Sequence, residues 1–176
     1  MKTNIALIGF MGVGKTEVGK ALAVKLNREF VELDSLIEQK TGKSISQIFE
    51  QDGEIIFREL EIEAIKKVSQ RENTVIACGG GVVLNKINID RLREEGRIVY
   101  LTASPDVVLK RISRGGEKRP LVNVSNRTLT VRELLKFRRP FYEGAADITV
   151  NTSNLNVNSV VECIINRLKD DEGFNL

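Results

Sequence analysis

Glycine, lysine and threonine follow the first apolar run of the chain with the spacing of a phosphate-binding loop. Residues 9–16 read GFMGVGKT, which matches GxxxxGK followed by Ser or Thr, and residues 5–8 before them are apolar. Glycines let backbone N–H groups and the start of a helix approach phosphate oxygens closely. Lys15 would reach the β- and γ-phosphates of ATP, and the Thr16 hydroxyl would bind Mg²⁺. The alternative is a glycine-rich turn that only begins a helix, but the place of the motif between a predicted strand and a predicted helix favours nucleotide binding.

A carboxylate, Asp34, stands where the second predicted strand ends. In open α/β sheets the carboxyl ends of the strands face the ligand crevice, so Asp34 should point to the same cavity as the glycine loop. There it could accept the proton of a hydroxyl group that attacks the γ-phosphorus. The alternative is that Asp34 caps the helix predicted from Ser35.

The helix predicted from residue 53 carries charge on two of its faces. At 100° per residue, Glu54, Arg58 and Glu61 form one stripe between apolar side chains, which must pair internally or face a ligand. A salt-bridge ladder is one interpretation, because the spacings i,i+4 and i,i+3 bring these side chains together. The other is that the two carboxylates hold Arg58 for bidentate contact with a substrate carboxylate. Both interpretations stay open at this point.

Two later segments could line the same cavity. Residues 79–81 are all glycine and follow a predicted strand, so their backbone N–H groups could contact a ligand. Residues 137–142 read FRRPFY, in which Arg138 comes two positions before Pro140. The proline predicts a kink or a break in the helix that contains it. Arg138 itself could be a ligand or ordinary surface charge.

Composition narrows the class of protein. The 176 residues, 41% of them hydrophobic, suit one domain, residues 1–176, with a single core. Because the chain has no histidine, proton transfer must fall to a carboxylate, lysine, tyrosine or cysteine. The net charge of +3 gives no argument for nucleic acid, and no apolar run is long enough to span a membrane. We therefore expect a cytoplasmic monomer that acts on small molecules, with Cys78 and Cys163 as structural thiols.

The elements that must position these residues follow from an alternation of short apolar runs with longer amphipathic runs. This pattern is typical of an α/β fold, and here it predicts a five-stranded parallel sheet with helices on both faces. The predicted strands span residues 4–8, 29–33, 74–78, 97–101 and 147–151. The predicted helices span residues 15–26, 35–40, 46–50, 53–70, 87–95, 105–113, 130–145 and 158–169.

One segment does not fit the alternation. Residues 113–126 read SRGGEKRPLVNVSN and combine glycine, proline and several basic side chains. A long irregular connection in a compact domain is usually functional or disordered. We expect this segment to form a mobile lid, with flexibility from Gly115 and Gly116.

These segments, in this order, resemble the shikimate kinase family of the nucleoside-monophosphate-kinase-like P-loop proteins. The resemblance covers residues 5–168 and is carried by GFMGVGKT, residues 33–61, the glycine triplet, KRPL and RRPFY. It implies a three-layer α/β/α P-loop kinase fold and transfer of the γ-phosphate of ATP to the 3-hydroxyl of shikimate. The reaction belongs to aromatic amino-acid biosynthesis, and the resemblance implies Mg²⁺ as the cofactor.

The resemblance also implies roles for individual residues. Asp34 would act as the base, while Lys15 and Arg119 would offset the charge of the transferred phosphate. Glu61 would orient Arg58. The residues implied to bind the acceptor are Asp34, Arg58, Gly80 and Arg138. The residues implied to bind the nucleotide are Gly12, Val13, Gly14, Lys15, Thr16, Glu17, Arg111 and Arg119, with Thr16 as the Mg²⁺ ligand.

The sequence leaves two rival functions to be tested. A related hydroxy-acid kinase, such as a gluconate kinase, would keep the glycine loop and the basic lid but accept another acid. A non-catalytic regulator that binds nucleotide or shikimate could be built on the same fold, although Lys15, Asp34 and Arg119 argue against it because a sensor has no need of them. A further difference concerns Glu32, which stands where the family often has aspartate and could still support Mg²⁺ through a water molecule.

Overall fold

A parallel β-sheet forms the middle of the protein. The computed structural model describes residues 1–114 and 127–176. In this part of the chain, five parallel strands form one sheet, as predicted, and their order is β2-β3-β1-β4-β5. The strands are β1 (Asn4–Ile8), β2 (Glu29–Glu32), β3 (Thr74–Ala77), β4 (Gly96–Thr102) and β5 (Ile148–Asn151).

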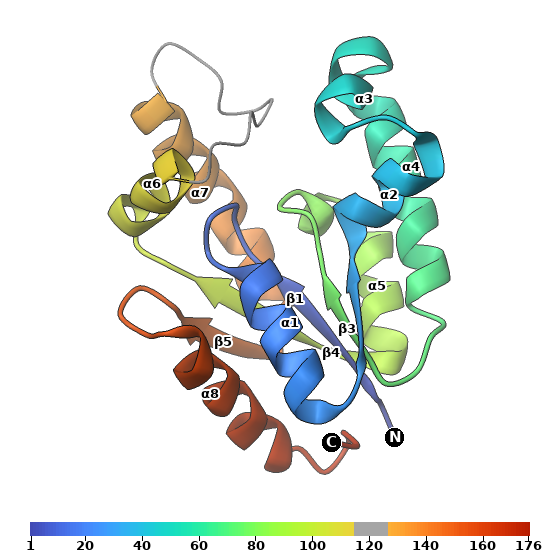
Figure 1. The fold of residues 1–176 in the computed structure, drawn as a ribbon, viewed down its shortest axis with the longest axis vertical. Coiled ribbons are helices and arrows are strands. Elements are labelled where there is room, and N and C mark those ends of the chain that lie inside the picture. The colour runs from blue at the N-terminus through green and yellow to red at the C-terminus, as the bar shows by residue number, and fades with distance from the viewer. Residues whose placement is uncertain (115–126) are drawn as a thin grey trace.

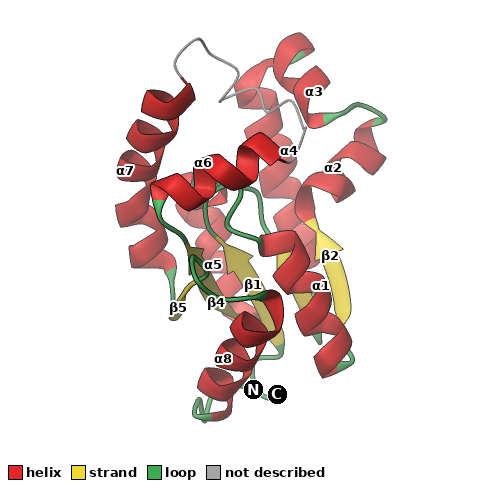
Figure 2. Cartoon of the chain, turned by 60° about the vertical axis from the view of Figure 1, so that its left-hand side comes forward, coloured by secondary structure: helices red, strands yellow, loops and turns green. Residues whose placement is uncertain are grey.

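Helices cover both faces of the sheet and give the three predicted layers. In Figure 1, α1 (Lys15–Leu26) and α8 (Val157–Lys169) lie on the near face, and α5 (Lys86–Glu95) and α7 (Arg127–Ala145) lie on the far face. Figure 2 shows the sheet between these two groups of helices. The other helices are α2 (Leu33–Thr41), α3 (Ile45–Gln51), α4 (Gly53–Val68), α6 (Pro105–Arg114) and the short 3₁₀-helix η1 (Val82–Leu84).

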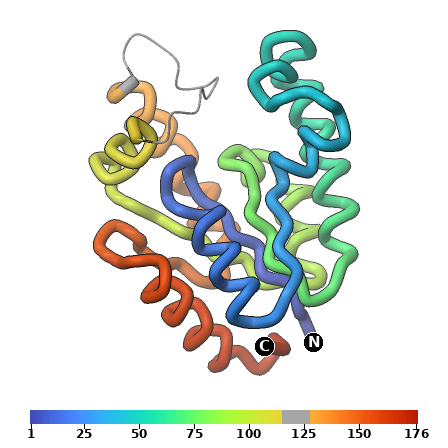
Figure 3. Tube along the Cα trace, in the orientation of Figure 1, coloured from blue at the N-terminus to red at the C-terminus, as the bar shows by residue number. Residues whose placement is uncertain are grey.

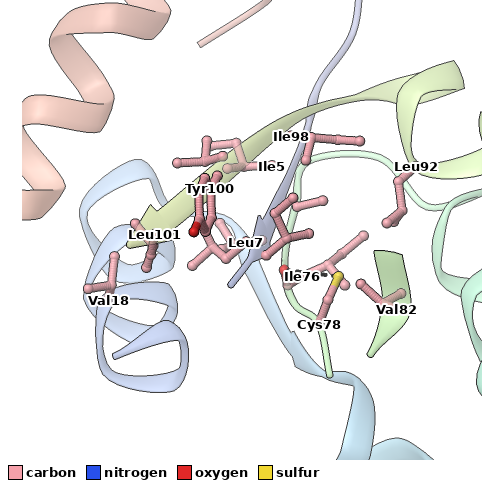
Figure 4. Packing of buried hydrophobic residues seen from close by; sticks show 14 of the residues in the cluster. Ile5, Leu7, Val18, Ile76, Cys78, Val82, Leu92, Ile98, Tyr100 and Leu101 are labelled. Atoms are coloured by element: carbon pink, nitrogen blue, oxygen red, sulfur yellow. Dashed lines mark hydrogen bonds between the residues drawn. The ribbon is translucent and has the colours of Figure 1, made fainter. Parts of the chain in front are cut away.

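The apolar runs become the core because strands covered on both faces must be apolar on both sides. Every residue of β1 and β3 is buried. Figure 4 shows Cys78 beside Val82 within this core, as expected for a structural thiol. Burial raises the pKa of the Cys78 thiol to about 12, and the nearby Glu61 carboxylate adds to the rise. The thiol therefore stays protonated at neutral pH.

Most of the elements differ from the prediction by one to three residues at one or both ends, and the difference at the start of α2 bears on the site. Helix α2 begins at Leu33 with Glu32 as its N-cap, so Asp34 lies inside the first turn and is not the cap. Glu32 is still extended, with φ −98° and ψ 117°, and strand β2 ends there, one residue earlier than predicted, because Leu33 already belongs to the helix. Helix α7 continues through Pro140 to Ala145, its predicted end, so the helix is not broken at the proline. Proline removes one backbone donor, but the rest of a long helix can continue past it.

The strand order places the candidate residues at one edge of the sheet. In Figure 3 the blue turn after β1 and the green turn after β3 lie beside each other at the carboxyl ends of these strands. The phosphate loop, the start of α2 and the glycine triplet follow β1, β2 and β3 respectively. Among the described residues, no helix is long and apolar enough to cross a membrane. The expected lid, residues 113–126, begins within α6 and otherwise lies outside the described residues.

Candidate active site

The glycine loop has the backbone conformation of an anion site. Gly9, Gly12 and Gly14 have φ values of 144°, 78° and 102°, in the region that side chains rarely adopt. At Gly9 an ideal Cβ would lie 2.3 Å from the carbonyl oxygen of Leu101, so no side chain fits. Helix α1 begins at Lys15, and no side chain caps its first N–H groups. These groups can therefore serve an anion.

Lys15 and Thr16 lie in the first turn of α1 and bind different groups: Lys15 binds the backbone of the glycine loop, and Thr16 binds a carboxylate. The Lys15 ammonium donates to the carbonyl oxygens of Gly9 at 2.8 Å and Phe10 at 3.0 Å, and thus lies over the loop. The Thr16 hydroxyl donates to the Glu32 carboxylate at 2.5 Å, and Ser35 donates to the other oxygen of Glu32 at 3.0 Å.

The Thr16–Glu32 pair supplies the hard oxygen donors that Mg²⁺ takes from proteins, and Mg²⁺ commonly takes its other ligands from phosphates and water. The pair therefore fits a Mg²⁺ ion that arrives with a nucleotide. Within the described residues, no group of three or more His, Cys, Asp and Glu side chains could hold a metal.

Arg111 ties the phosphate loop to the end of the sheet. Its guanidinium donates to the carbonyl oxygens of Gly12 at 3.3 Å and Val13 at 3.2 Å, and to the Thr152 hydroxyl at 2.9 Å. The buried Thr152 hydroxyl in turn donates to Val13 at 2.9 Å. Arg111 is a predicted site residue, whereas Thr152, which follows β5 and lies 139 positions after Val13, is not. No local pattern marks such a contact.

Arg58 is held by carboxylates on both sides, so the predicted ladder exists. Its guanidinium donates to Glu54 at 3.0 Å and to Glu61 at 3.1 Å. Glu61 is fully buried, whereas the Glu54 side chain is half-exposed. Arg58 also reaches the glycine triplet, because an ideal Cβ at Gly81 would lie 2.4 Å from its Nη1. The ladder therefore fixes an arginine that borders the candidate ligand site.

Gly79 makes room for two carboxylates. An ideal Cβ there would lie 3.0 Å from Asp34 Oδ1 and 3.1 Å from Glu61 Oε1. Any side chain larger than hydrogen would push these oxygens away from the backbone. The first glycine of the triplet thus lets Asp34 and Glu61 approach the end of β3 together.

Gly80 lies close to both Arg138 and the phosphate loop. An ideal Cβ at this position would lie 3.5 Å from Arg138 Nη1, and 3.7 Å from both Gly9 O and Met11 N. Arg138 is buried, with its guanidinium 5.9 Å from the centre of the Phe10 ring. The candidate donor and acceptor residues therefore meet at the triplet.

Tyr142 is a neighbour of this site that the sequence analysis did not select. It lies one helical turn after Arg138, is fully buried, and donates its hydroxyl proton to the carbonyl oxygen of Gly80. The i,i+4 spacing within RRPFY is the signal that could have placed it on the same face as Arg138.

Burial dominates the electrostatics of Glu61. It raises the pKa of this carboxyl from its ordinary value of 4.5 to about 7, although Arg58 pulls the pKa down and Asp34 pushes it up. Glu61 therefore changes its charge near neutral pH, next to the arginine that it orients.

Residues 11–169 match the model of the family described as shikimate kinase. The chain belongs to the shikimate kinase family. A shikimate kinase of Caldanaerobacter subterraneus subsp. tengcongensis is 47% identical over 162 residues, which cover 92% of this chain and 94% of the relative. ATP is accordingly the co-substrate that the family implies.

Solved structures agree with the family. A shikimate kinase from Acinetobacter baumannii in complex with shikimate has a TM-score of 0.93 and 37% identity, covering 98% of this chain and 96% of that one. A gluconokinase from Sinorhizobium meliloti has a TM-score of 0.63 and 22% identity, covering 96% and 94%, and this likeness shows the fold alone. The predicted site residue Arg119 lies outside the described residues.

The buried charge of Glu61 gives a pH dependence with a defined sign. Because the pKa is about 7 in the folded state against 4.5 ordinarily, the folded protein holds this proton more tightly than the unfolded chain does. The stability that Glu61 contributes is therefore greatest below about pH 4.5 and is lost as the pH rises through about 7. From about pH 5 to about pH 8, we expect the free energy of unfolding of the wild type, relative to Glu61→Gln, to fall by about 2–3 kcal/mol.

Urea denaturation at a series of pH values measures this difference. Glu54→Gln is the matched control, because Glu54 bonds the same arginine from a half-exposed position where its charge stays hydrated. The control should change much less over the same range. A difference for Glu61→Gln that does not vary with pH would show that the buried carboxyl keeps one charge state throughout.

Proposed function

We propose that this chain transfers the γ-phosphate of ATP to the 3-hydroxyl of shikimate, giving shikimate 3-phosphate and ADP. The observation that carries the proposal is the convergence of Asp34, Arg58 and Arg138 on one glycine triplet beside the phosphate loop. Family membership and the likeness to a shikimate-bound kinase support the same acceptor.

The arginines account for an acceptor that carries a carboxylate. Arg58 and Arg138 come from α4 and α7 and lie against Gly81 and Gly80. Their planar guanidinium groups suit bidentate contact with a carboxylate, and burial strengthens that contact. A neutral sugar would offer neither guanidinium group a carboxylate to bind.

Asp34 is the proposed general base. Its Oδ1 lies at the Gly79 end of the triplet, beside Glu61. From there it aligns the acceptor hydroxyl and takes its proton as the oxygen attacks the γ-phosphorus. Asp34 lies in the first turn of α2, so a regular helix and not a flexible loop fixes its position.

On the donor side, the proposed role of the glycine loop is to hold the phosphates through backbone N–H groups. Lys15 exchanges its contacts with Gly9 and Phe10 for the β- and γ-phosphate oxygens and offsets their charge. Thr16, with Glu32 behind it, would hold Mg²⁺, which supplies further charge neutralisation between the phosphates when bound. Arg119 would act in the same way, an assignment that rests on its RPL sequence motif alone.

Comparison of acceptors is the direct test. We expect steady-state ADP release to depend on shikimate, with kcat/KM at least about 100-fold above that for gluconate, because the site is built to hydrogen-bond one particular acid. Preference for gluconate would overturn the acceptor assignment. Tight nucleotide and shikimate binding without ADP release would instead favour a non-catalytic regulator.

Asp34→Asn tests the proposed base. The amide cannot accept the proton, so shikimate-dependent turnover should fall about 100-fold or more while the ATP dissociation constant stays within about twofold. Rapid-quench turnover and calorimetric titration with ATP measure the two effects. Asp90→Asn is the control, because Asp90 pairs with Lys86 on the exposed side of α5 and should leave turnover unchanged. Full turnover in Asp34→Asn would remove Asp34 as the base.

Gly81→Ala tests the acceptor pocket without changing a charged residue. The new methyl group would overlap the Arg58 guanidinium, which can move because it ends a flexible side chain. We expect the KM for shikimate to rise about tenfold or more and the KM for ATP to stay within about twofold. The control is Gly144→Ala in α7, where an added Cβ meets nothing within 4 Å. An equal loss for both substrates would mean that the triplet does not serve the acceptor specifically.

A further inference from the structure

Tyr142 combines full burial with a polar contact to the centre of the site. Its ring stacks on Tyr100, with ring centres 5.0 Å apart and an interplanar angle of 17°. Its hydroxyl donates to the carbonyl oxygen of Gly80. A buried tyrosine hydroxyl needs such a partner, but here the partner is the middle residue of the triplet that separates the two arginines.

The Tyr142 hydrogen bond fixes the direction of a peptide group. Glycine residues leave the backbone of the triplet with many accessible conformations, so something outside it must select one. In a planar trans peptide, the carbonyl oxygen of Gly80 and the N–H of Gly81 point in opposite directions. Holding the Gly80 carbonyl against α7 therefore turns the Gly81 N–H away from Tyr142.

Tyr142 also links the peptide to an arginine. Arg138 lies four residues earlier on α7 and thus on the same helical face, and its Nη1 lies 3.5 Å from the Cβ position of Gly80. Burial raises the pKa of the Tyr142 hydroxyl above its ordinary value, and the positive charge of Arg138 offsets part of that rise. The hydroxyl therefore stays protonated and remains a donor.

We propose that Tyr142 is a positioning residue for the acceptor: its hydroxyl holds the Gly80 peptide in register with Arg138, so that both present a fixed set of donors to the substrate. This inference rests on the proposed function. Tyr142 does not touch the reacting atoms, and its effect passes through Gly80 and Arg138.

Tyr142→Phe removes the hydroxyl and keeps the ring. Loss of the donor leaves the partly buried Gly80 carbonyl without this hydrogen bond, which frees the peptide to turn. We expect the KM for shikimate to rise about fivefold to twentyfold, which corresponds to loss of one hydrogen bond, with the KM for ATP within about twofold. The ¹H–¹⁵N signals of the three triplet glycines should shift in the free enzyme.

Tyr100→Phe is the matched control. Tyr100 belongs to the same stacked pair and is also buried, and within residues 1–114 and 127–176 its hydroxyl makes no hydrogen bond. Tyr100→Phe removes a hydroxyl of the same kind. We expect it to leave the triplet glycine signals and the KM for shikimate unchanged. Thermal unfolding of both variants checks that each remains folded at the assay temperature.

The outcomes separate this inference from the proposed function. Wild-type enzyme that does not phosphorylate shikimate would contradict the proposed function and the positioning role with it. Wild-type enzyme that does so, with Tyr142→Phe matching it in shikimate KM and in the triplet glycine signals, would contradict the positioning role alone. Equal rises in both KM values for Tyr142→Phe would assign Tyr142 to packing, and would also overturn the inference.

Discussion

The absence of a Cβ at residues 79–81 is the constraint on which the site depends. Three successive backbone positions each border a different functional side chain: Gly79 borders Asp34, Gly80 borders Arg138 and Gly81 borders Arg58. An alanine Cβ would lie 3.0 Å from Asp34 at Gly79 and 2.4 Å from Arg58 at Gly81, so it would displace these groups, whereas the 3.5 Å to Arg138 at Gly80 is ordinary van der Waals contact. Because a glycine backbone has many accessible conformations, contacts with surrounding side chains must hold the triplet in one of them. The contacts from α7 and α4 do so.

The parallel sheet explains why these contacts form at all. Neighbouring parallel strands end at the same edge, and β1 pairs with both β3 and β4 in the observed order. The glycine loop after β1 therefore lies next to the triplet after β3, and α2 brings Asp34 from the adjacent strand β2. Ligand crevices form where the connections leave the sheet in opposite directions, and this is such a position. The candidate donor and acceptor residues thus lie together at one edge of the sheet.

Much of this arrangement was predictable because its signals are local. The glycine loop, the Arg58 ladder and the triplet each lie within a short segment and are where the pattern places them, and Asp34 lies just after β2, in the first turn of α2. Helix α2 began earlier than predicted because Glu32, not Asp34, occupies the N-cap. Tyr142 and Thr152 were missed because their partners are 62 and 139 positions away, and hydrogen bonds across such separations leave no periodicity in the sequence.

The carboxylates on either side of Arg58 have two opposing effects on it. Carboxylates orient Arg58, but each also offsets the charge that would attract an anionic acceptor. The half-exposed Glu54 is screened by water, whereas the buried Glu61 acts at low dielectric and matters more. Because burial raises the pKa of Glu61 to about 7, part of its population is neutral near that pH. A neutral Glu61 still offers a carbonyl oxygen to Arg58 and leaves the guanidinium charge free for a substrate carboxylate. Burial of this carboxyl therefore reduces the negative charge that stands against Arg58.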